Sequence, residues 1–197
     1  MTRPIQAFQA IVIGGSAGAM EALLTLLPAL PATLRASIAV TLHVQRDKPS
    51  LLAQVFGPRC ALAVREAHDQ EPLEPGTIFF APPDYHLLVD QGPRLSLSLD
   101  APLHFSRPAI DVLFESAADL LGEHLIGILL SGANADGAQG LAAIHRAGGL
   151  CLVQSPDSAP SPTMPLAALS LVPDGAQVLS PAAMAETLIG LHTRRLL

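Results

Sequence analysis

Short runs of apolar residues recur along the chain, and each run ends at a glycine, a proline or a polar turn. Five of them are continuous rather than alternating, which is typical of strands covered on both faces of a parallel sheet. These five strand candidates are residues 10–13, 38–42, 61–64, 78–81 and 125–130. Weaker strand candidates are residues 150–154 and 177–179. Residues 86–89 and 95–99 flank a turn-forming Asp-Gln-Gly-Pro sequence and predict a β-hairpin.

Helical patterns lie between these strands, because apolar residues recur there at intervals of three and four. The expected helices cover residues 20–27, 110–121, 141–147 and 181–191. Pro108 and Gly122 are expected to open and close the second helix, and Ser180 is expected to cap the last. Residues 155–165, rich in proline and serine, predict a loop. Strands and helices that alternate from end to end indicate an α/β fold with a mostly parallel sheet.

Length and charge narrow the classes of protein to consider. The chain has 197 residues, which favours a single domain spanning residues 1–197. It carries 11 Lys and Arg against 17 Asp and Glu, a formal net charge of −6. We therefore expect no nucleic-acid partner, because proteins that bind nucleic acid need positive charge to neutralise the phosphates.

A hydrophobic content of 50% raises the question of a membrane. The most apolar region, residues 11–34, contains Glu21, three glycines and two prolines. A spanning helix needs about 20 apolar residues without such interruptions, and a secretory signal needs an unbroken apolar centre. We therefore expect a cytoplasmic protein that is not inserted in a membrane.

The cysteines and histidines give no sign of a metal site. Cys60 and Cys151 form no Cys-x-x-Cys pair and are expected to be buried free thiols. No cluster of His, Cys, Asp or Glu has the spacing of a zinc site, so we expect no metal and no cofactor. Four histidines are interpreted as surface or capping groups: His68, His104, His124 and His145.

Three chemically active residues directly follow predicted strands. Ser16 follows strand 10–13 after two glycines, His43 follows strand 38–42, and Asp136 lies in the loop after strand 125–130. In an open α/β sheet, ligands bind outside the carboxyl ends of the strands, and these ends share one edge. A hydroxyl, an imidazole and a carboxylate on one edge are the groups needed for a base-activated nucleophile.

The serine has further local support, because it lies in a Gly-x-Ser-x-Gly sequence between a strand and a helix. This turn exposes the first N–H groups of the following helix, so the N–H of Ala17 is the first candidate to stabilise an oxyanion. A phosphate-binding turn is the alternative, but neither Gly-x-Gly-x-x-Gly nor a P-loop lysine is present. If each residue is considered by itself, a simpler interpretation is available: His43 as a histidine of the core, and Asp136 as the N-cap of the helix that follows it.

Several separated motifs, in order, resemble one known family. The sequence is similar to the catalytic domain of the chemotaxis protein-glutamate methylesterases (CheB) over about residues 9–190. The matching segments are residues 11–18, 40–43, 81–89, 107–114, 129–138, 140–141 and 147–149. The resemblance implies a three-layer, doubly wound α/β domain, with a mainly parallel sheet and a small antiparallel hairpin.

The resemblance also implies an activity. It implies a serine hydrolase that removes methyl esters from glutamate side chains of chemoreceptors and that also deamidates receptor glutamines. The nucleophile, the base and the carboxylate of the family fall on Ser16, His43 and Asp136. The family often has threonine where this chain has Ala17, and methionine where it has Ala133. The backbone N–H groups of Ala17 and Ala133 are the expected oxyanion donors.

Full chemotaxis methylesterases carry a receiver domain before the esterase domain. Only about nine residues precede the first predicted strand here, so we expect an excised or stand-alone catalytic domain, regulated by a separate receiver or other regulator. The expected partner is the cytoplasmic region of a methylated chemoreceptor, and the expected state is a monomer. Two alternatives stay open: a stand-alone serine esterase or amidase on another substrate, and a non-catalytic module that binds a receptor or a phosphate.

Overall fold

A parallel sheet of seven strands forms the centre of the molecule. The computed structural model describes residues 7–44 and 48–197. From one edge of the sheet to the other, the strands are β3 (Ala63–Glu66), β4 (Thr77–Phe80), β2 (Ser37–Leu42), β1 (Ala10–Gly15), β7 (Leu125–Leu129), β8 (Leu150–Gln154) and β9 (Ala176–Leu179). All six neighbouring pairs run parallel. The prediction of a mainly parallel α/β sheet is therefore confirmed.

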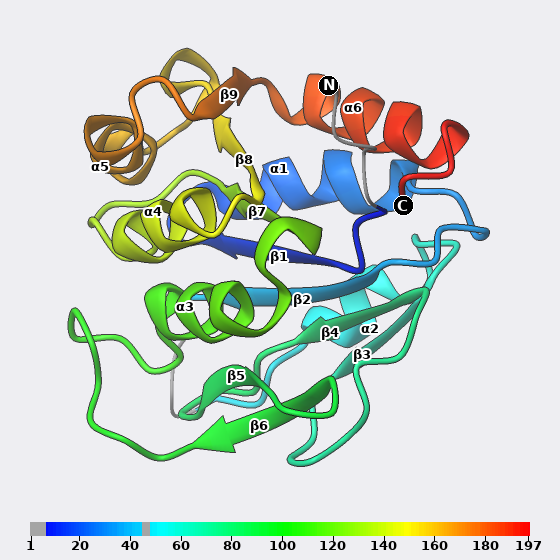
Figure 1. Cartoon of the computed structure of the whole chain (residues 1–197). Helices are drawn as coiled ribbons and strands as arrows, with labels where there is room; N and C mark the ends of the chain where they lie inside the picture. The colour runs from blue at the N-terminus through cyan, green and yellow to red at the C-terminus, as the bar shows by residue number, and fades with distance from the viewer. Residues whose placement is uncertain (1–6, 45–47) are drawn as a thin grey trace.

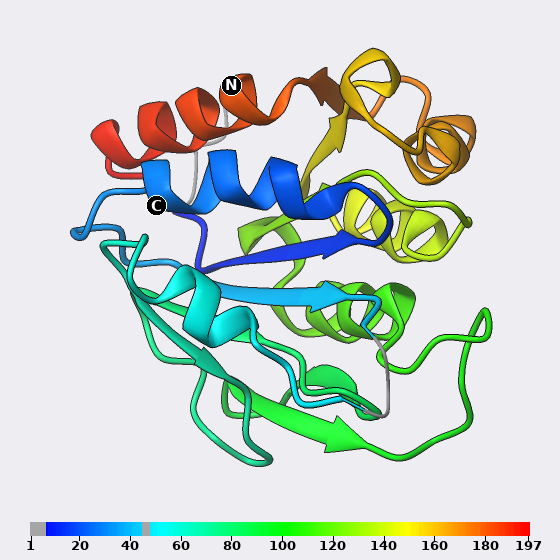
Figure 2. The same cartoon turned by 180° about the vertical axis from the view of Figure 1, so that it is seen from behind.

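Two layers of helices cover the sheet, as Figures 1 and 2 show from opposite sides. One face packs against the helices α1 (Ala19–Leu26), α2 (Leu52–Phe56) and α6 (Pro181–Thr193). The other face packs against α3 (Ile110–Leu121), α4 (Ala138–Arg146), α5 (Thr163–Leu171) and the hairpin of β5 (His86–Asp90) and β6 (Arg94–Ser98). The hairpin forms a separate antiparallel sheet of two strands. The three-layer arrangement with a small hairpin is thus as expected.

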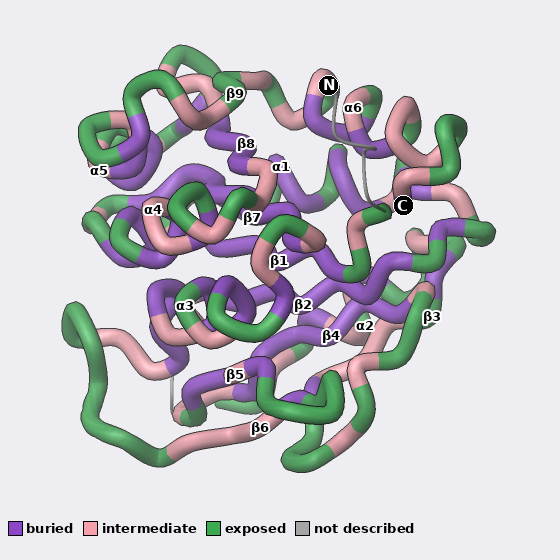
Figure 3. Tube along the Cα trace, viewed as in Figure 1, coloured by how far each residue is buried: buried purple, intermediate pink, exposed green. Residues whose placement is uncertain are grey.

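The continuous apolar runs form the buried strands. Every residue of β1, β2, β4 and β7 is buried (Figure 3). The edge strand β3 is an exception, because it starts two residues later than predicted and is only partly buried. Its register is set by pairing with β4, and the Arg65 guanidinium stacks over the Phe79 ring at 4.7 Å.

Several helix boundaries differ from the predicted ones. Helix α3 begins at Ile110 with Ala109 at the N-cap, so Pro108 precedes the helix instead of opening it. Helix α5 begins at Thr163, inside the predicted loop, because a proline in the first turn of a helix costs no hydrogen bond. The five-residue helix α2 is too short to show a period and was not predicted. The cap at Ser180 is confirmed, since its hydroxyl accepts from the N–H of Ala183 at 3.3 Å.

The order of the strands places the site. Strand β1 lies in the centre, with β2 on one side and β7 on the other, and the chain reaches these neighbours through helices on opposite faces. Such a reversal of strand order leaves a crevice at the carboxyl ends of the strands. Among the described residues, no helix is both long enough and apolar enough to cross a membrane.

Candidate active site

The register of the central strands brings Ser16 and His43 to neighbouring positions. Gly15 pairs with Leu42 at the ends of β1 and β2, and the N–H of His43 donates to the carbonyl of Gly15 at 3.2 Å. On the other side, the N–H of Ser16 donates to the carbonyl of Ser131, after β7, at 2.9 Å. The three strand ends that the sequence analysis selected therefore share one edge.

The imidazole of His43 contacts the carboxylate of Asp136 directly. His43 Nε2 lies 2.7 Å from Asp136 Oδ2. The Asp136 side chain is fully buried, and that of His43 is 12% exposed. Because Nε2 faces the carboxylate, Nδ1 is the ring nitrogen left for a second partner. This pair has the geometry of a base and the group that orients it.

Asp136 is held by the first turn of α3. Its carboxylate accepts from the N–H of Ile110 at 2.7 Å and from the N–H of Asp111 at 3.0 Å. Burial on its own raises the pKa of Asp136, but the hydrogen bonds from His43 and from these two N–H groups outweigh it and lower the pKa below its usual range. Asp136 therefore stays ionised beside His43 at neutral pH.

This cap differs from the one predicted from the sequence alone. Asp136 caps α3, whose first turn precedes it by more than twenty residues, and not its own helix α4. The N-cap of α4 is Gly137, in a left-handed conformation with φ 89°. The side chain of Asp136 turns away from its own helix because His43 and the α3 N-terminus satisfy it on the other side.

A network around Ser131 holds the nucleophile turn. The buried hydroxyl of Ser131 donates to the carbonyl of Ala17 at 2.7 Å and accepts from the N–H of Ser161 at 2.9 Å. Gly18 has φ 81°, and a Cβ there would lie 2.8 Å from Ser131 Oγ and 2.7 Å from Pro160 Cβ. The turn therefore needs glycine for both its conformation and its contacts.

The expected oxyanion donors have unused N–H groups. Within residues 7–44 and 48–197, neither Ala17 nor Ala133 donates a backbone hydrogen bond. Both residues are exposed at this edge of the sheet. By contrast, the N–H of Ser16 is taken by Ser131, and the N–H of Gly132 donates to the carbonyl of Ser161 at 3.0 Å. Among the described residues, Ala17 and Ala133 therefore keep free donors, whereas the residue before each of them does not.

One expected contact is not made. No hydrogen bond among the described residues joins the hydroxyl of Ser16, which is half-buried, to His43. Bonds between a nucleophile and its base are often long in the absence of substrate. The structure thus joins His43 and Asp136 directly. It places Ser16 beside His43, because each directly follows a strand residue of the Gly15–Leu42 pair.

The remaining candidates lie outside this edge. His192 lies on α6, and its Nε2 is 3.0 Å from the hydroxyl of Thr33. His86 is buried in the hairpin and its Nδ1 accepts from the N–H of Ala109 at 3.1 Å. Both cysteines are free, but only Cys151 is fully buried, and Cys60 is half-buried.

Three residues that support the site were not predicted from the sequence. Asp111 was not selected because it lies inside a predicted helix, and Ser131 was not selected, although it directly follows the predicted strand 125–130, because a serine in a loop has an ordinary structural explanation. Arg107, before α3, was also missed. Its guanidinium donates to the carboxylate of Asp84 at 2.8 Å and to the carbonyl of Leu99 at 2.8 Å. It therefore anchors the loop that leads into the α3 N-terminus.

Comparison with known proteins is consistent with this geometry. A protein from Symbiobacterium thermophilum, named protein-glutamate methylesterase/protein-glutamine glutaminase, is 39% identical over 144 residues, which are 73% of this chain and 40% of that protein. A relative from Leptospira interrogans, with the same name in provisional form, is 39% identical over 189 residues, which are 96% of this chain and 97% of that protein. A relative from Methanospirillum hungatei with the same name is 34% identical over 96% of this chain and 54% of its own length.

A solved structure and a family model agree with these relatives. The catalytic domain of the Thermotoga maritima CheB methylesterase has the same fold, with a TM-score of 0.88 and 28% identity, covering 94% of this chain and 99% of that one. The model of the CheB methylesterase family matches residues 11–188, which include all three strand-end residues. This chain, with its histidine–aspartate pair beside a strand-end serine, belongs to the CheB methylesterase family.

Proposed function

We propose that this protein is a serine hydrolase that removes methyl esters from glutamate side chains in the cytoplasmic region of methyl-accepting chemoreceptors. The observation that carries the proposal is the 2.7 Å contact between His43 Nε2 and Asp136 Oδ2, one strand away from Ser16. The names of the relatives, protein-glutamate methylesterase/protein-glutamine glutaminase, supply the substrate. Because that substrate segment is cytoplasmic, the proposed place of action is the cytoplasm.

The first half of the reaction forms an ester on Ser16. The Ser16 oxygen attacks the carbonyl carbon of the methyl ester while His43 Nδ1 accepts the hydroxyl proton. Asp136 keeps the other proton of the ring on Nε2 and stabilises the imidazolium that forms. The tetrahedral intermediate then collapses: the bond to the methoxy oxygen breaks, and His43 returns the proton to release methanol.

The second half restores the enzyme. A water molecule attacks the glutamyl ester of Ser16, and His43 Nδ1 takes one proton from that water. The bond to the Ser16 oxygen breaks, the proton moves to Ser16, and the glutamate leaves with a free carboxyl group. Deamidation of glutamine follows the same steps, with ammonia as the leaving group in place of methanol.

Backbone N–H groups stabilise the charge on the carbonyl oxygen in both halves. We assign this role to Ala17 and Ala133, because their N–H groups have no partner among the described residues. Fixed donors aimed at a developing oxyanion are worth about 10²–10³-fold in rate each. Since these are backbone groups, alanine at either position retains the donor.

The reaction is tested with a receptor fragment that carries labelled methyl groups. The wild-type protein should release labelled methanol, and Ser16→Ala should lose at least about 10³-fold in rate. Ser170→Ala is the matched control, because Ser170 is an exposed serine on α5. Methanol release by Ser16→Ala at the wild-type rate would contradict the proposal.

The same assay distinguishes the alternatives. Hydrolysis of simple esters without any release from the receptor fragment would identify an esterase with another substrate. Folded protein that hydrolyses neither would indicate a binding module. Regulation by a separate receiver domain is part of the proposal and is tested by adding a phosphorylated receiver to the same reaction, which should raise the rate.

A further inference from the structure

A second buried carboxylate lies next to the site and has no part in the reaction described above. Asp111, the second residue of α3, is 2% exposed. Burying a carboxylate is costly unless hydrogen bonds or charges compensate it. The groups that compensate for the burial of Asp111 therefore indicate the role of its carboxylate.

Asp111 and Asp136 exchange caps between two helices. The N–H of Asp111, on α3, donates to Asp136 Oδ1 at 3.0 Å. In return, the N–H of Gly140, in the first turn of α4, donates to Asp111 Oδ1 at 2.7 Å. Asp136 lies one residue before the N-cap of α4, so each carboxylate satisfies backbone N–H at the start of the helix that the other belongs to or precedes. Neither helix can shift at this point without lengthening both hydrogen bonds.

The two helices are also in close contact here. A Cβ on Gly140 would lie 3.2 Å from the Asp111 Cα and 2.4 Å from Phe114 Cβ. There is thus no room for a side chain at this position, and the backbone of α4 rests on the first turn of α3. The Gly140–Asp111 hydrogen bond is the polar link across this contact, and it fixes the loop that carries Asp136.

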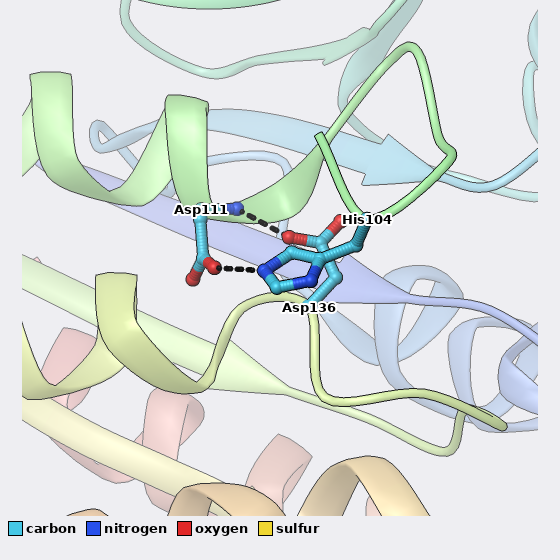
Figure 4. Close-up of side chains that lie close together, drawn as sticks. All are labelled: His104, Asp111 and Asp136. Atoms are coloured by element: carbon cyan, nitrogen blue, oxygen red, sulfur yellow. Dashed lines mark hydrogen bonds and ion pairs between the residues drawn. The ribbon is translucent and has the colours of Figure 1, made fainter. Parts of the chain in front are cut away.

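His104 covers the other oxygen of Asp111. Its Nε2 lies 3.4 Å from Asp111 Oδ2, and its side chain is 44% exposed (Figure 4). Burial raises the pKa of the Asp111 carboxyl, the charges of Asp136 and Glu115 add to this rise, and the Gly140 N–H and His104 oppose it. The exposed histidine is thus a weaker partner of Asp111 than the buried N–H.

The three side chains are close enough to hold a cation, since one ligand atom from each lies within 4.8 Å of the others. Two features oppose a cation there. The cluster lies at the N-terminus of a twelve-residue helix, where the partial positive charge favours anions. Both carboxylates already accept backbone N–H groups. The cluster is better described as a hydrogen-bonded support for Asp136.

We propose that Asp111 is a positioning residue for the esterase reaction: through its hydrogen bond to the N–H of Gly140 it holds the loop of Asp136 so that this carboxylate meets His43. This inference rests on the proposed function for its kinetic consequence. Its structural consequence, the geometry of the His43–Asp136 pair, is independent of the substrate.

The test compares three substitutions at Asp111 in the full chain. Asp111→Asn keeps an oxygen that accepts from Gly140, whereas Asp111→Ala removes it, and Asp111→Leu keeps the branched shape without an acceptor. Kinetics are measured per active site, titrated with a fluorophosphonate, so that misfolded protein does not count. The imidazole N–H signal of His43 in ¹⁵N-histidine-labelled protein reports its bond to Asp136 directly.

We expect Asp111→Ala and Asp111→Leu to lower kcat per active site by about 10–100-fold, with KM within twofold, because a misplaced carboxylate weakens only the oriented base. The His43 N–H signal should shift upfield or broaden in both. Asp111→Asn should keep the signal and stay within about threefold of wild-type kcat. His104→Ala should also stay within about threefold, because the hydrogen bond from the Gly140 N–H goes to Asp111 Oδ1 and His104 lies by the other oxygen.

Several results would overturn the assignment. Asp111→Leu with wild-type kcat and an unchanged His43 signal would show that the Gly140 hydrogen bond positions nothing. An effect of His104→Ala as large as that of Asp111→Ala would move the role from the hydrogen bond to the histidine. A wild-type protein that shows the His43 signal and its loss in Asp111→Ala, but hydrolyses no ester, would contradict the proposed function and leave the positioning intact.

Discussion

His43 meets Asp136 through Nε2, at 2.7 Å, so that Nδ1 is the ring nitrogen available to Ser16. Two backbone N–H groups of α3 hold the other side of the same carboxylate. The Asp136 carboxylate therefore cannot turn toward α4. The imidazole of His43 has one orientation in which Nε2 faces Asp136 and Nδ1 is available to Ser16. The geometry of the proposed base depends on the first turn of a helix, whose two N–H donors lie 26 and 25 residues before Asp136 in the sequence.

Asp136→Asn should abolish most of the activity. The amide keeps the shape but no longer stabilises the charged imidazole or fixes its tautomer, and the corresponding change in serine protease triads costs about 10⁴-fold in kcat. We expect a loss on the order of 10³–10⁴-fold in methanol release at pH 7. Asp157→Asn, at an exposed aspartate, is the matched control and should leave the rate unchanged. A rate within tenfold of wild type would remove Asp136 from the mechanism.

Asp136 and Asp111 should affect stability with opposite dependence on pH. The pKa of Asp136 is lowered in the folded state, so its charge stabilises the fold above the unfolded value of about 3.9 and is lost as pH falls through the folded value. The pKa of Asp111 is raised, so its protonated form favours folding at low pH, and this contribution is lost as pH rises through the folded value.

The measurement is the free energy of unfolding in urea between pH 3 and pH 7. Relative to wild type, Asp136→Asn should lose stability as pH rises, and Asp111→Asn should gain it. Parallel changes in the two variants would show that the environments of these carboxylates have been assigned wrongly.

Gly137→Ala should destabilise the protein and slow the reaction. Gly137 has φ 89°, and a Cβ there would lie 2.5 Å from Leu129 Cδ1 and 2.7 Å from Ile110 Cγ2. The strain costs about 1–2 kcal/mol, and the clash displaces Ile110, whose N–H holds Asp136. Gly92→Ala is a matched control, because Gly92 has φ 79° but nothing within 4 Å of an added Cβ. Equal losses of stability in the two variants would show that the clash has no energetic consequence.

Ser131→Ala should weaken the nucleophile turn. The change leaves the carbonyl of Ala17 and the N–H of Ser161 without the hydroxyl that joins them, at a cost of about 1–3 kcal/mol in the free energy of unfolding. We also expect kcat to fall, because the Ala17–Gly18 peptide, which follows the peptide that carries the Ala17 N–H, loses its anchor. Chemical denaturation and methanol release measure the two effects. If Ser131→Ala had the wild-type free energy of unfolding, the buried hydroxyl of Ser131 would contribute nothing to stability.

The two thiols should differ in reactivity. Burial raises the pKa of Cys151 to about 12, and that of Cys60 is raised as well, although Cys60 is half-buried. Since the thiolate is the reactive form, an alkylating reagent at pH 8 should modify Cys60 first and Cys151 only after unfolding. Mass spectrometry of the native and denatured protein identifies the order. Faster modification of Cys151 in the native state would contradict its burial.

The sequence alone predicted the centre of the fold because its signal is local. Strands β1, β2, β4 and β7 are continuous apolar runs buried on both faces, and such runs need no knowledge of the rest of the chain. The rule that ligands bind at the carboxyl ends of parallel strands then selected Ser16, His43 and Asp136. The hairpin was predicted for a similar reason, because its turn residues are adjacent in the sequence.

The supporting contacts could not be predicted in the same way, because they join distant segments. An aspartate at the second position of a helix, such as Asp111, is ordinary in the sequence, since acidic residues favour the first turn of any helix. Only the packing of α3 against α4 shows that it caps Gly140. Likewise, Asp136 has the sequence of a local N-cap, and its use by α3 depends on tertiary structure.

The central claim is that Ser16 is a nucleophile activated by His43 and Asp136. Its most direct test is the rate at which a fluorophosphonate probe forms a covalent adduct, with the modified residue identified by mass spectrometry. The account predicts one adduct, on Ser16, that forms at least about 10²-fold more slowly in His43→Ala and in Asp136→Asn. An adduct on another residue, or an unchanged rate in both variants, would contradict it.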